Sequence, residues 1–176
     1  LPGRVRVGRK GSAMRKYTLL AGLFLATSLT LNPSLLAKER KDVPKGLTWD
    51  LEQIYSGPEA WRVARQKVAD RLPELAVFQG HLGESGPGLW SAFSKMLEIR
   101  KELDRVNAYA YFLADQDTRD SKNGEMRSQA QQLLTDFESA TAFFRPELLA
   151  LGEPKVKSLI AAEPKLAAYQ AVFDDI

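Results

Sequence analysis

The chain's one histidine is the first residue to consider for catalysis or metal binding, because cysteine is absent. His81 is followed by Leu82, Gly83 and Glu84 within a glycine-rich stretch. A zinc site takes three or four protein ligands, which a single imidazole without partners does not supply. We therefore interpret His81 as an exposed loop residue with no catalytic, cofactor-binding or metal-ligating role.

Three aspartates form a second group, and their spacing could belong to a metal-binding site. Asp115, Asp117 and Asp120 resemble the start of a calcium-binding loop, which needs glycine at its sixth position and an acidic residue at its twelfth. Counted from Asp115, those positions hold Asp120 and Met126. The match fails, and a solvated loop at the end of a helix accounts better for these carboxylates.

Aromatic residues are a third group, since they could line a peptide-binding cleft. Tyr109, Tyr111 and Phe112 stand close together, but aromatics at helical spacing are more often part of a core. The same holds for Phe143 and Phe144. The serines lack a histidine partner, so a serine hydrolase has no support. We expect no catalytic, cofactor-binding or metal-ligating residue in this chain.

A helix over residues 89–113 organises the rest of the chain. Its apolar residues alternate at spacings of three and four, the a/d period of a helix that packs along a partner helix. They are Leu89, Ala92, Met96, Ile99, Leu103, Val106, Ala110 and Leu113. Trp90, Phe93 and Phe112 widen this stripe, which indicates contact with more than one partner.

A second helix over about residues 125–144 repeats the pattern. Its apolar residues are Met126, Ala130, Leu133, Phe137, Ala140 and Phe144. Residues 114–124 between the two are polar and end in Asn-Gly, which predicts an antiparallel helical hairpin. Two faces that met only each other would leave the aromatics half exposed, so we expect the hairpin to pack with flanking helices in a larger helical lobe.

Prolines and glycines delimit the flanking elements. Pro58 is expected to open a helix, and Pro73 to kink it or start a new turn. The glycine-rich residues 80–88 are expected to form a loop, and Pro146 to end the second hairpin helix. Further short helices should start at Pro146, Pro154 and Pro164. No clean period-2 alternation occurs, so the predicted fold class is all-α.

The net charge of +3 is unevenly distributed. Residues 1–37 hold six basic residues and no acidic one, so the other 19 basic residues face 22 acidic ones, a net charge of −3. The remainder shows no basic patch, which argues against nucleic acid as a partner.

The N-terminal segment has the pattern of an export signal. We expect residues 1–13 to be upstream read-through, with Met14 as the true start. Residues 14–37 resemble a signal peptide, with Arg15 and Lys16 before an uncharged apolar stretch that is short for a membrane span. Residues 38–46 read as a disordered charged linker, and order should begin near Leu47.

The helical domain is expected over residues 47–176, with Trp49 and Leu51 as early apolar anchors. The apolar pattern stops at Ile176 without a cap, which we interpret as truncation at the C-terminus.

Four segments, in order along the chain, resemble the N-terminal helical region of oligoendopeptidase F, a family of thimet-oligopeptidase-like zinc metallopeptidases. They are Thr48-Trp-Asp-Leu-Glu-Gln-Ile-Tyr55 with Glu59-Ala-Trp61, His81-Leu-Gly-Glu-Ser85, Tyr109-Ala-Tyr111 with Asp115-Gln-Asp-Thr-Arg119, and Phe143-Phe-Arg-Pro-Glu-Leu-Leu-Ala-Leu151. The resemblance runs from about Thr48 to Ile176.

This resemblance implies a zinc endopeptidase that cleaves oligopeptides in a deep cleft, with its metal on an H-E-x-x-H helix. The chain lacks that motif, so it should bind no zinc and be inactive alone. Its implied partners are oligopeptide substrates, through the intact enzyme, and the missing catalytic lobe. The signal pattern implies a periplasmic or secreted protein that meets the membrane only during export.

Two alternatives remain open. The chain could be a stand-alone exported helical binding module without catalysis. It could also be a membrane-tethered helical protein, if the apolar stretch of residues 18–31 is not cleaved.

Overall fold

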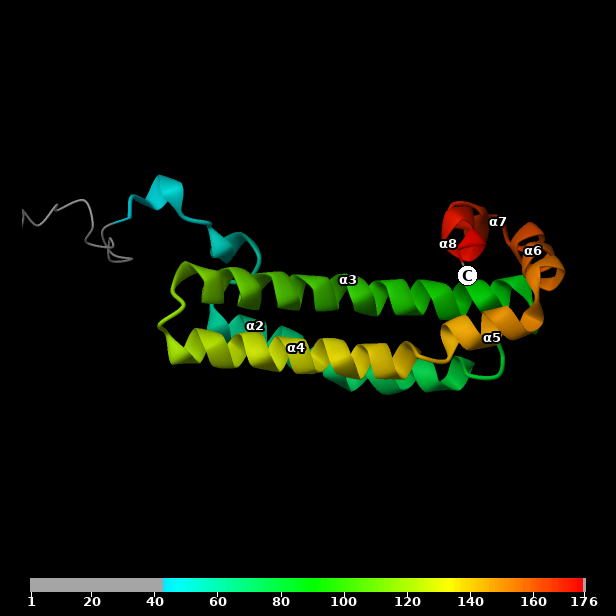
Figure 1. Cartoon of the computed structure of the whole chain (residues 1–176), viewed down its shortest axis with the longest axis horizontal. Coiled ribbons are helices and arrows are strands. Elements are labelled where there is room, and N and C mark those ends of the chain that lie inside the picture. Colours follow the sequence, from blue (N-terminus) through cyan, green and yellow to red (C-terminus); the bar gives the residue numbers. More distant parts are fainter. Residues whose placement is uncertain (1–42, 176) are drawn as a thin grey trace, which may run out of the picture. The chain divides into compact units, whose positions relative to one another are not determined.

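The computed structural model describes residues 43–175. This part is all helical and contains no strand, as predicted. In order the elements are η3 (Lys45–Leu47), η4 (Leu51–Gln53), α2 (Pro58–Arg71), η5 (Leu72–Phe78), α3 (Gly86–Gln116), α4 (Ser121–Thr141), α5 (Phe144–Leu151), α6 (Glu153–Ala162), α7 (Pro164–Ala167) and α8 (Gln170–Asp174) (Figure 1).

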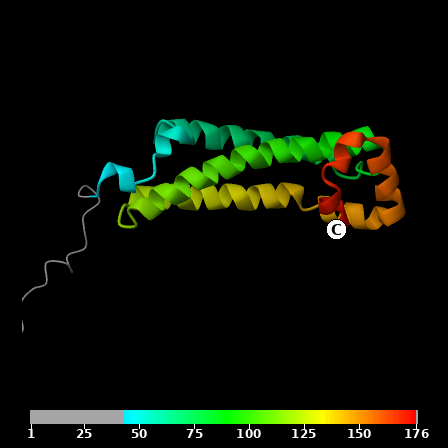
Figure 2. The ribbon, with the colours of Figure 1, turned by 90° about the horizontal axis from the view of Figure 1, so that it is seen from above.

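Helices α3 and α4 form the predicted antiparallel hairpin. Figure 2 shows them side by side along the length of α4, with α2 also alongside α3. The a/d residues of α3 are buried, except that Met96 and Leu113 are partly buried. Met126, Ala130, Leu133 and Phe137 of α4 are buried as well. The two apolar seams therefore meet as their spacing predicts.

The ends of the hairpin helices differ from the prediction. Helix α3 already begins at Gly86, because the Ser85 hydroxyl accepts a hydrogen bond from the Gly88 amide at 3.1 Å. The connection is shorter than residues 114–124 and comprises only residues 117–120. Asp120 caps α4 by accepting from the Lys122 amide at 2.9 Å, which places Asn-Gly in the first turn of α4. A strong cap thus outweighs the turn preference of Asn-Gly.

Helix α2 begins at Pro58 as predicted, and the helical path changes near Pro73. Pro73 lies in the first turn of η5, a seven-residue 3-10 helix that follows α2 without a gap. The indole of Trp61 on α2 is fully buried and donates a hydrogen bond to the Val106 carbonyl of α3 at 2.9 Å. This bond fixes α2 against the C-terminal half of α3.

The buried side chains form two clusters. The bundle core lies among α2, η5, α4 and the C-terminal part of α3. Its members are Leu51, Trp61, Val68, Leu72, Leu75, Ile99, Leu103, Val106, Tyr109, Ala110, Met126, Ala130, Leu133 and Phe137. The cap core lies where α5–α8 gather against the N-terminal part of α3. Its members are Leu82, Leu89, Ala92, Phe93, Phe144, Leu148, Val156, Leu159, Ile160, Leu166 and Phe173. Met96 of α3 packs against both cores.

The short helices of the cap follow the prolines with two corrections. Helix α4 ends at Thr141, before Pro146, which instead occupies the first turn of α5. Glu153-Pro154 starts α6 as predicted. The single helix predicted after Pro164 is divided into α7 and α8, which are separated by residues 168–169. A proline in a first helical turn needs no amide partner and therefore starts these helices well.

The loop before α3 is tied to α5 by one carboxylate. Glu147 accepts from the Gly80 amide at 2.8 Å and from the Leu82 amide at 2.7 Å. Gly80 has φ of 85°, a conformation that glycine adopts readily. Gly86 packs so tightly that a Cβ there would lie 2.5 Å from the Leu159 carbonyl oxygen. The start of α3 therefore packs directly on α6.

The predictions for the read-through segment and the signal peptide concern residues outside the described part. The same applies to residues 38–42 of the predicted linker, while Lys45–Leu47 of the described part forms a 3-10 turn. Within residues 43–175, no helix has the length and apolar content required to cross a bilayer.

Candidate functional site

His81 lies in the loop between η5 and α3 and is exposed. Its Nδ1 lies 2.6 Å from Oε1 of Glu84. The hydrogen bond to Glu84 and the charge of that carboxylate raise the pKa of His81 above its ordinary value. The imidazole is thus engaged in a local surface ion pair, and its surroundings offer no set of ligands for a metal.

The three aspartates of the hairpin turn are all engaged in local contacts. Asp115 lies 3.3 Å from the Arg127 guanidinium, and Asp117 accepts from the Arg119 amide at 3.0 Å. Asp120 is the N-cap of α4. The Asp120 carboxylate thus starts α4, the Asp115 and Asp117 carboxylates pair with arginines, and among the described residues no three histidine or acidic side chains lie together as a possible metal cluster.

The aromatic residues of α3 point to different surroundings. Tyr109 is buried and meets Tyr55 edge-on, with 5.6 Å between ring centroids. Burial raises the pKa of the Tyr109 hydroxyl. Tyr111 instead contacts α4, since its hydroxyl lies 2.5 Å from Oε1 of Gln131 and the Arg127 guanidinium lies over its ring. Tyr109 and Tyr111 therefore line no common cleft.

The third of these aromatics forms an exposed pair. Phe112 is 38% exposed and packs against Trp49, which is 54% exposed, with ring centroids 4.4 Å apart and the ring planes tilted by 55°. Of the two predicted apolar anchors, Leu51 is buried, whereas Trp49 is half exposed and contacts Phe112. Phe144 is buried and Phe143 is half-buried, in agreement with the core prediction.

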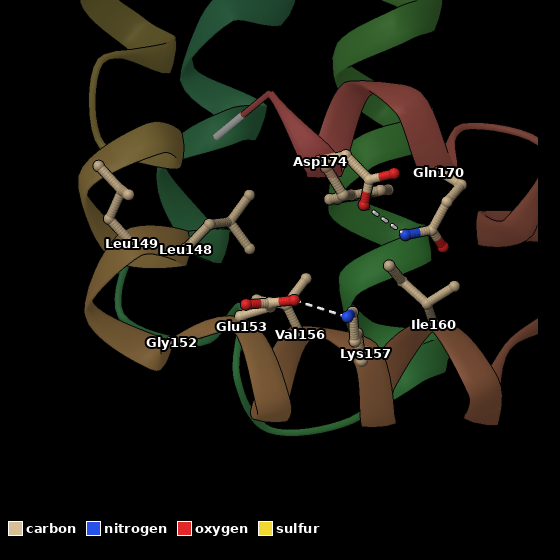
Figure 3. Close-up of a pocket in the computed structure, with 10 residues that line it drawn as sticks. Leu148, Leu149, Gly152, Glu153, Val156, Lys157, Ile160, Gln170 and Asp174 are labelled. Atoms are coloured by element: carbon tan, nitrogen blue, oxygen red, sulfur yellow. Dashed lines mark hydrogen bonds and ion pairs between the residues drawn. The ribbon is translucent and has the colours of Figure 1, made fainter.

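A concave site lies between α5, α6 and α8 and has a volume of about 540 Å³. Its walls combine the apolar side chains of Leu148, Leu149, Val156, Ile160 and Phe173 with the polar ones of Glu153, Lys157, Gln170 and Asp174 (Figure 3). Leu148, Val156, Ile160 and Phe173 are buried at its base, whereas Leu149 is 55% exposed. In Figure 3, the two leucines of α5 lie across the pocket from the residues of α8.

The polar groups of this pocket pair with one another. Lys157 forms an ion pair with Glu153 at 2.5 Å, and the Gln170 amide donates to Asp174 at 2.6 Å. The hydrogen bond and charge of Glu153 raise the pKa of Lys157, with a smaller contribution from Asp174. The pocket thus presents an apolar base and a rim whose charges are largely satisfied. Its buried base is suited to receiving apolar side chains.

The sequence analysis did not identify this pocket. A signal for it existed in the adjacent pairs Leu148-Leu149 and Val172-Phe173, because successive residues of a helix point about 100° apart and one residue of such a pair can face outward. The structure buries Leu148 and Phe173 and exposes Leu149 and Val172.

Curated proteins with similar sequences are peptidases. The chain is 32% identical over 138 residues to Oligopeptidase PepF of Bacillus subtilis, covering 78% of this chain and 21% of that protein. It is 31% identical over 140 residues to the plasmid-encoded Oligoendopeptidase F of Lactococcus lactis subsp. cremoris, covering 79% of the chain and 23% of the relative. The chain thus spans less than a quarter of the length of these relatives. It matches no protein-family model.

Two crystal structures share the fold. A putative peptidase from Chlamydophila abortus matches 79% of this chain and 24% of its own, with a TM-score of 0.71 and 23% identity. Oligoendopeptidase-F from Enterococcus faecium matches 65% of this chain and 22% of its own, with a TM-score of 0.60 and 21% identity. The helical arrangement of the described residues therefore recurs within longer chains.

Proposed function

Since the chain belongs to the oligoendopeptidase F family in the region that it shares with these relatives, we propose that it forms the N-terminal helical lobe of an exported zinc metalloendopeptidase that hydrolyses short peptides. The lobe would wall the substrate cleft and restrict entry to short, flexible peptides. The identity to Oligopeptidase PepF over 138 residues carries this proposal.

The donor set of this chain does not fit the zinc of such an enzyme. A catalytic zinc typically takes three protein ligands, often with histidine among them. The single histidine of the chain pairs with Glu84 at the surface, and the described residues group no further candidate ligands around it. In this proposal the zinc-binding residues lie in a part of the peptidase outside this chain, and the lobe contributes binding and exclusion of substrates.

The DNA that follows the codon of Ile176 tests the proposal directly. We expect an in-frame continuation that encodes H-E-x-x-H on a predicted helix. The longer product, loaded with zinc, should cleave short fluorogenic peptides, while the 176-residue chain should not. A stop codon directly after Ile176, or a continuation without a metal-binding motif, would remove the peptidase function.

A stand-alone binding module is the second candidate function, and the closed bundle core favours it. The core buries fourteen side chains among helices of the chain itself. This candidate predicts cooperative unfolding of the purified chain together with a stop codon after Ile176. A product that aggregates and unfolds without cooperativity would argue against the binding module.

Export through residues 14–37 is part of the proposal and rests on the sequence alone. The support is the pair of Arg15 and Lys16 before an uncharged apolar stretch. N-terminal sequencing of protein from the periplasmic or culture fraction should find a start near Lys38. Recovery of the intact N-terminus in the membrane fraction would instead identify a membrane-tethered protein.

A further inference from the structure

We propose that the pocket between α5, α6 and α8 is the seat on which the catalytic part of the peptidase packs, and that it receives apolar side chains of the segment that follows α8. This inference rests on the proposed function and specifies the partner surface within it. It distinguishes a permanent interface from a subsite for substrate.

The walls of the pocket favour an apolar occupant. Leu148, Val156 and Phe173 are almost fully buried, yet Leu149 beside them is 55% exposed. Val172, next to Phe173 on α8, is 47% exposed. Exposed apolar side chains around a concave site with an apolar base mark an interaction surface, because covering them removes apolar area from water.

The rim argues against an extended peptide substrate as the occupant. Recognition of a peptide backbone needs free donors and acceptors, as an open sheet edge provides. Here the side chains of Glu153 and Lys157 bind each other, and those of Gln170 and Asp174 do the same. In their inner turns, the helices that form the walls use their backbone groups internally. An occupant therefore gains mainly from apolar contact, which suits a face of an amphipathic helix.

The position of the pocket indicates which segment fills it. Helix α8 forms one wall through Phe173 and Asp174, and the Arg145 guanidinium donates to the Asp175 carbonyl at 3.3 Å. This bond ties the end of α8 to α5. The curated relatives are more than four times as long as the region that they share with this chain. In a protein of that length, the polypeptide that follows α8 starts at the wall of the pocket. It is therefore the segment nearest to the pocket along the chain.

The charge of the pocket rim limits which kind of helix can bind there. The ionised side chains that line the pocket are Glu153, Asp174 and Lys157, a net charge of −1. A helix with neutral or basic residues beside its apolar face meets this rim without repulsion, whereas an acidic one does not.

Peptide binding to the chain itself tests the inference. Overlapping peptides of about 20 residues, or five to six helical turns, would cover the part of Bacillus subtilis Oligopeptidase PepF that lies outside the matched region. We expect fluorescence anisotropy to show saturable binding of the peptides directly after that region. Leu149→Asp should weaken this binding by at least about tenfold, since a charge would replace an exposed contact residue.

Val77→Asp is the matched control. Val77 is a 68% exposed apolar residue on η5, outside the pocket, so its substitution should leave peptide binding unchanged. Far-ultraviolet circular dichroism of both variants should match the original chain, because both positions are solvent-exposed.

Two results would overturn the inference. One is binding of the following segment that Leu149→Asp leaves intact, or no binding of any peptide from outside the matched region. The other is saturable binding, lost in Leu149→Asp, of short unstructured peptides that Oligopeptidase PepF cleaves, which would make the pocket a substrate subsite. In the second case the proposed function survives, whereas a stop codon after Ile176 removes the function independently of these binding data.

Discussion

The bundle core and the cap core differ in how their helices meet. The bundle core is built on α3 and α4, which have 31 and 21 residues and pair side by side. The cap core is covered by four helices of 8, 10, 4 and 5 residues. Long helices interdigitate along continuous seams. Short helices meet near their ends and turns, and between three of them the pocket of about 540 Å³ remains.

The two regions also depend on each other unequally. Part of the cap core consists of side chains of α3. Phe93 of α3 contacts Tyr169 and Phe173, with ring centroids 5.0 Å and 5.2 Å apart. The bundle core uses no residue of α5–α8. We therefore expect destabilising substitutions in the bundle core to lower the stability of both regions. Destabilising substitutions in the cap core should affect mainly the cap.

Trp61→Ala should have the largest effect. It removes a fully buried indole and its hydrogen bond to the Val106 carbonyl, and should lower the free energy of unfolding by about 3–5 kcal/mol. Chemical denaturation measures this loss. Trp49→Ala is the matched control and should cost no more than about 1 kcal/mol, because Trp49 is half exposed. Equal losses for both would contradict the division between core and surface.

Gly86→Ala should destabilise the junction of α3 with the cap. The new methyl group would lie 2.5 Å from the Leu159 carbonyl oxygen, a backbone atom that cannot rotate away. We expect a loss of about 1–3 kcal/mol in thermal or denaturant unfolding. Gly83→Ala should cost less, since the new methyl group meets only the end of the flexible Leu151 side chain.

Gly124→Ala completes this series as a control without a clash. Gly124 is exposed in the first turn of α4, and apart from its chain neighbours and the nearby backbone of α4 no atom lies within 4 Å of its added Cβ. Alanine should raise the free energy of unfolding by up to about 1 kcal/mol through its helix propensity. A loss at Gly124 equal to that at Gly86 would show that the backbone approach is not the cause.

Glu147→Ala should loosen the tie between the cap and the loop before α3. It deletes the acceptor of the Gly80 and Leu82 amides, at a cost of about 1 kcal/mol. Hydrogen exchange should accelerate at these amides, while amides in the middle of α4 keep their protection. Uniform acceleration across both regions would contradict a local tie.

His81 should show the smallest effect, visible only in its titration. Because Glu84 raises the pKa of His81, the favourable interaction is fully present below the ordinary histidine pKa and is lost as pH rises through the raised value. In Glu84→Gln, the titration midpoint from nuclear magnetic resonance should fall. The same midpoint in both proteins would disprove the pair in solution.

Periodicity predicted the bundle better than the cap. The alternation of threes and fours from Leu89 to Leu113 identified the hairpin, because one long seam contains many independent matches. Boundaries were less accurate, since Ser85 and Asp120 act through single capping hydrogen bonds. The split between α7 and α8 and the exposure of Leu149 depend on tertiary packing among short helices. Such packing leaves little periodic signal in a segment of a few residues.

The continuity of α3 through both cores also bears on how the protein is made. Every member of the bundle core precedes Ala142 in the chain, and every helix of the cap follows it apart from α3. A ribosome therefore completes one core before synthesising the cover of the other. A nascent chain that has reached Thr141 contains the bundle-core residues that pack against Leu103 and Val106. The cap helices that cover Leu89 and Phe93 have not yet been synthesised. This uncovered end of α3 is the surface that a chaperone would meet during translation.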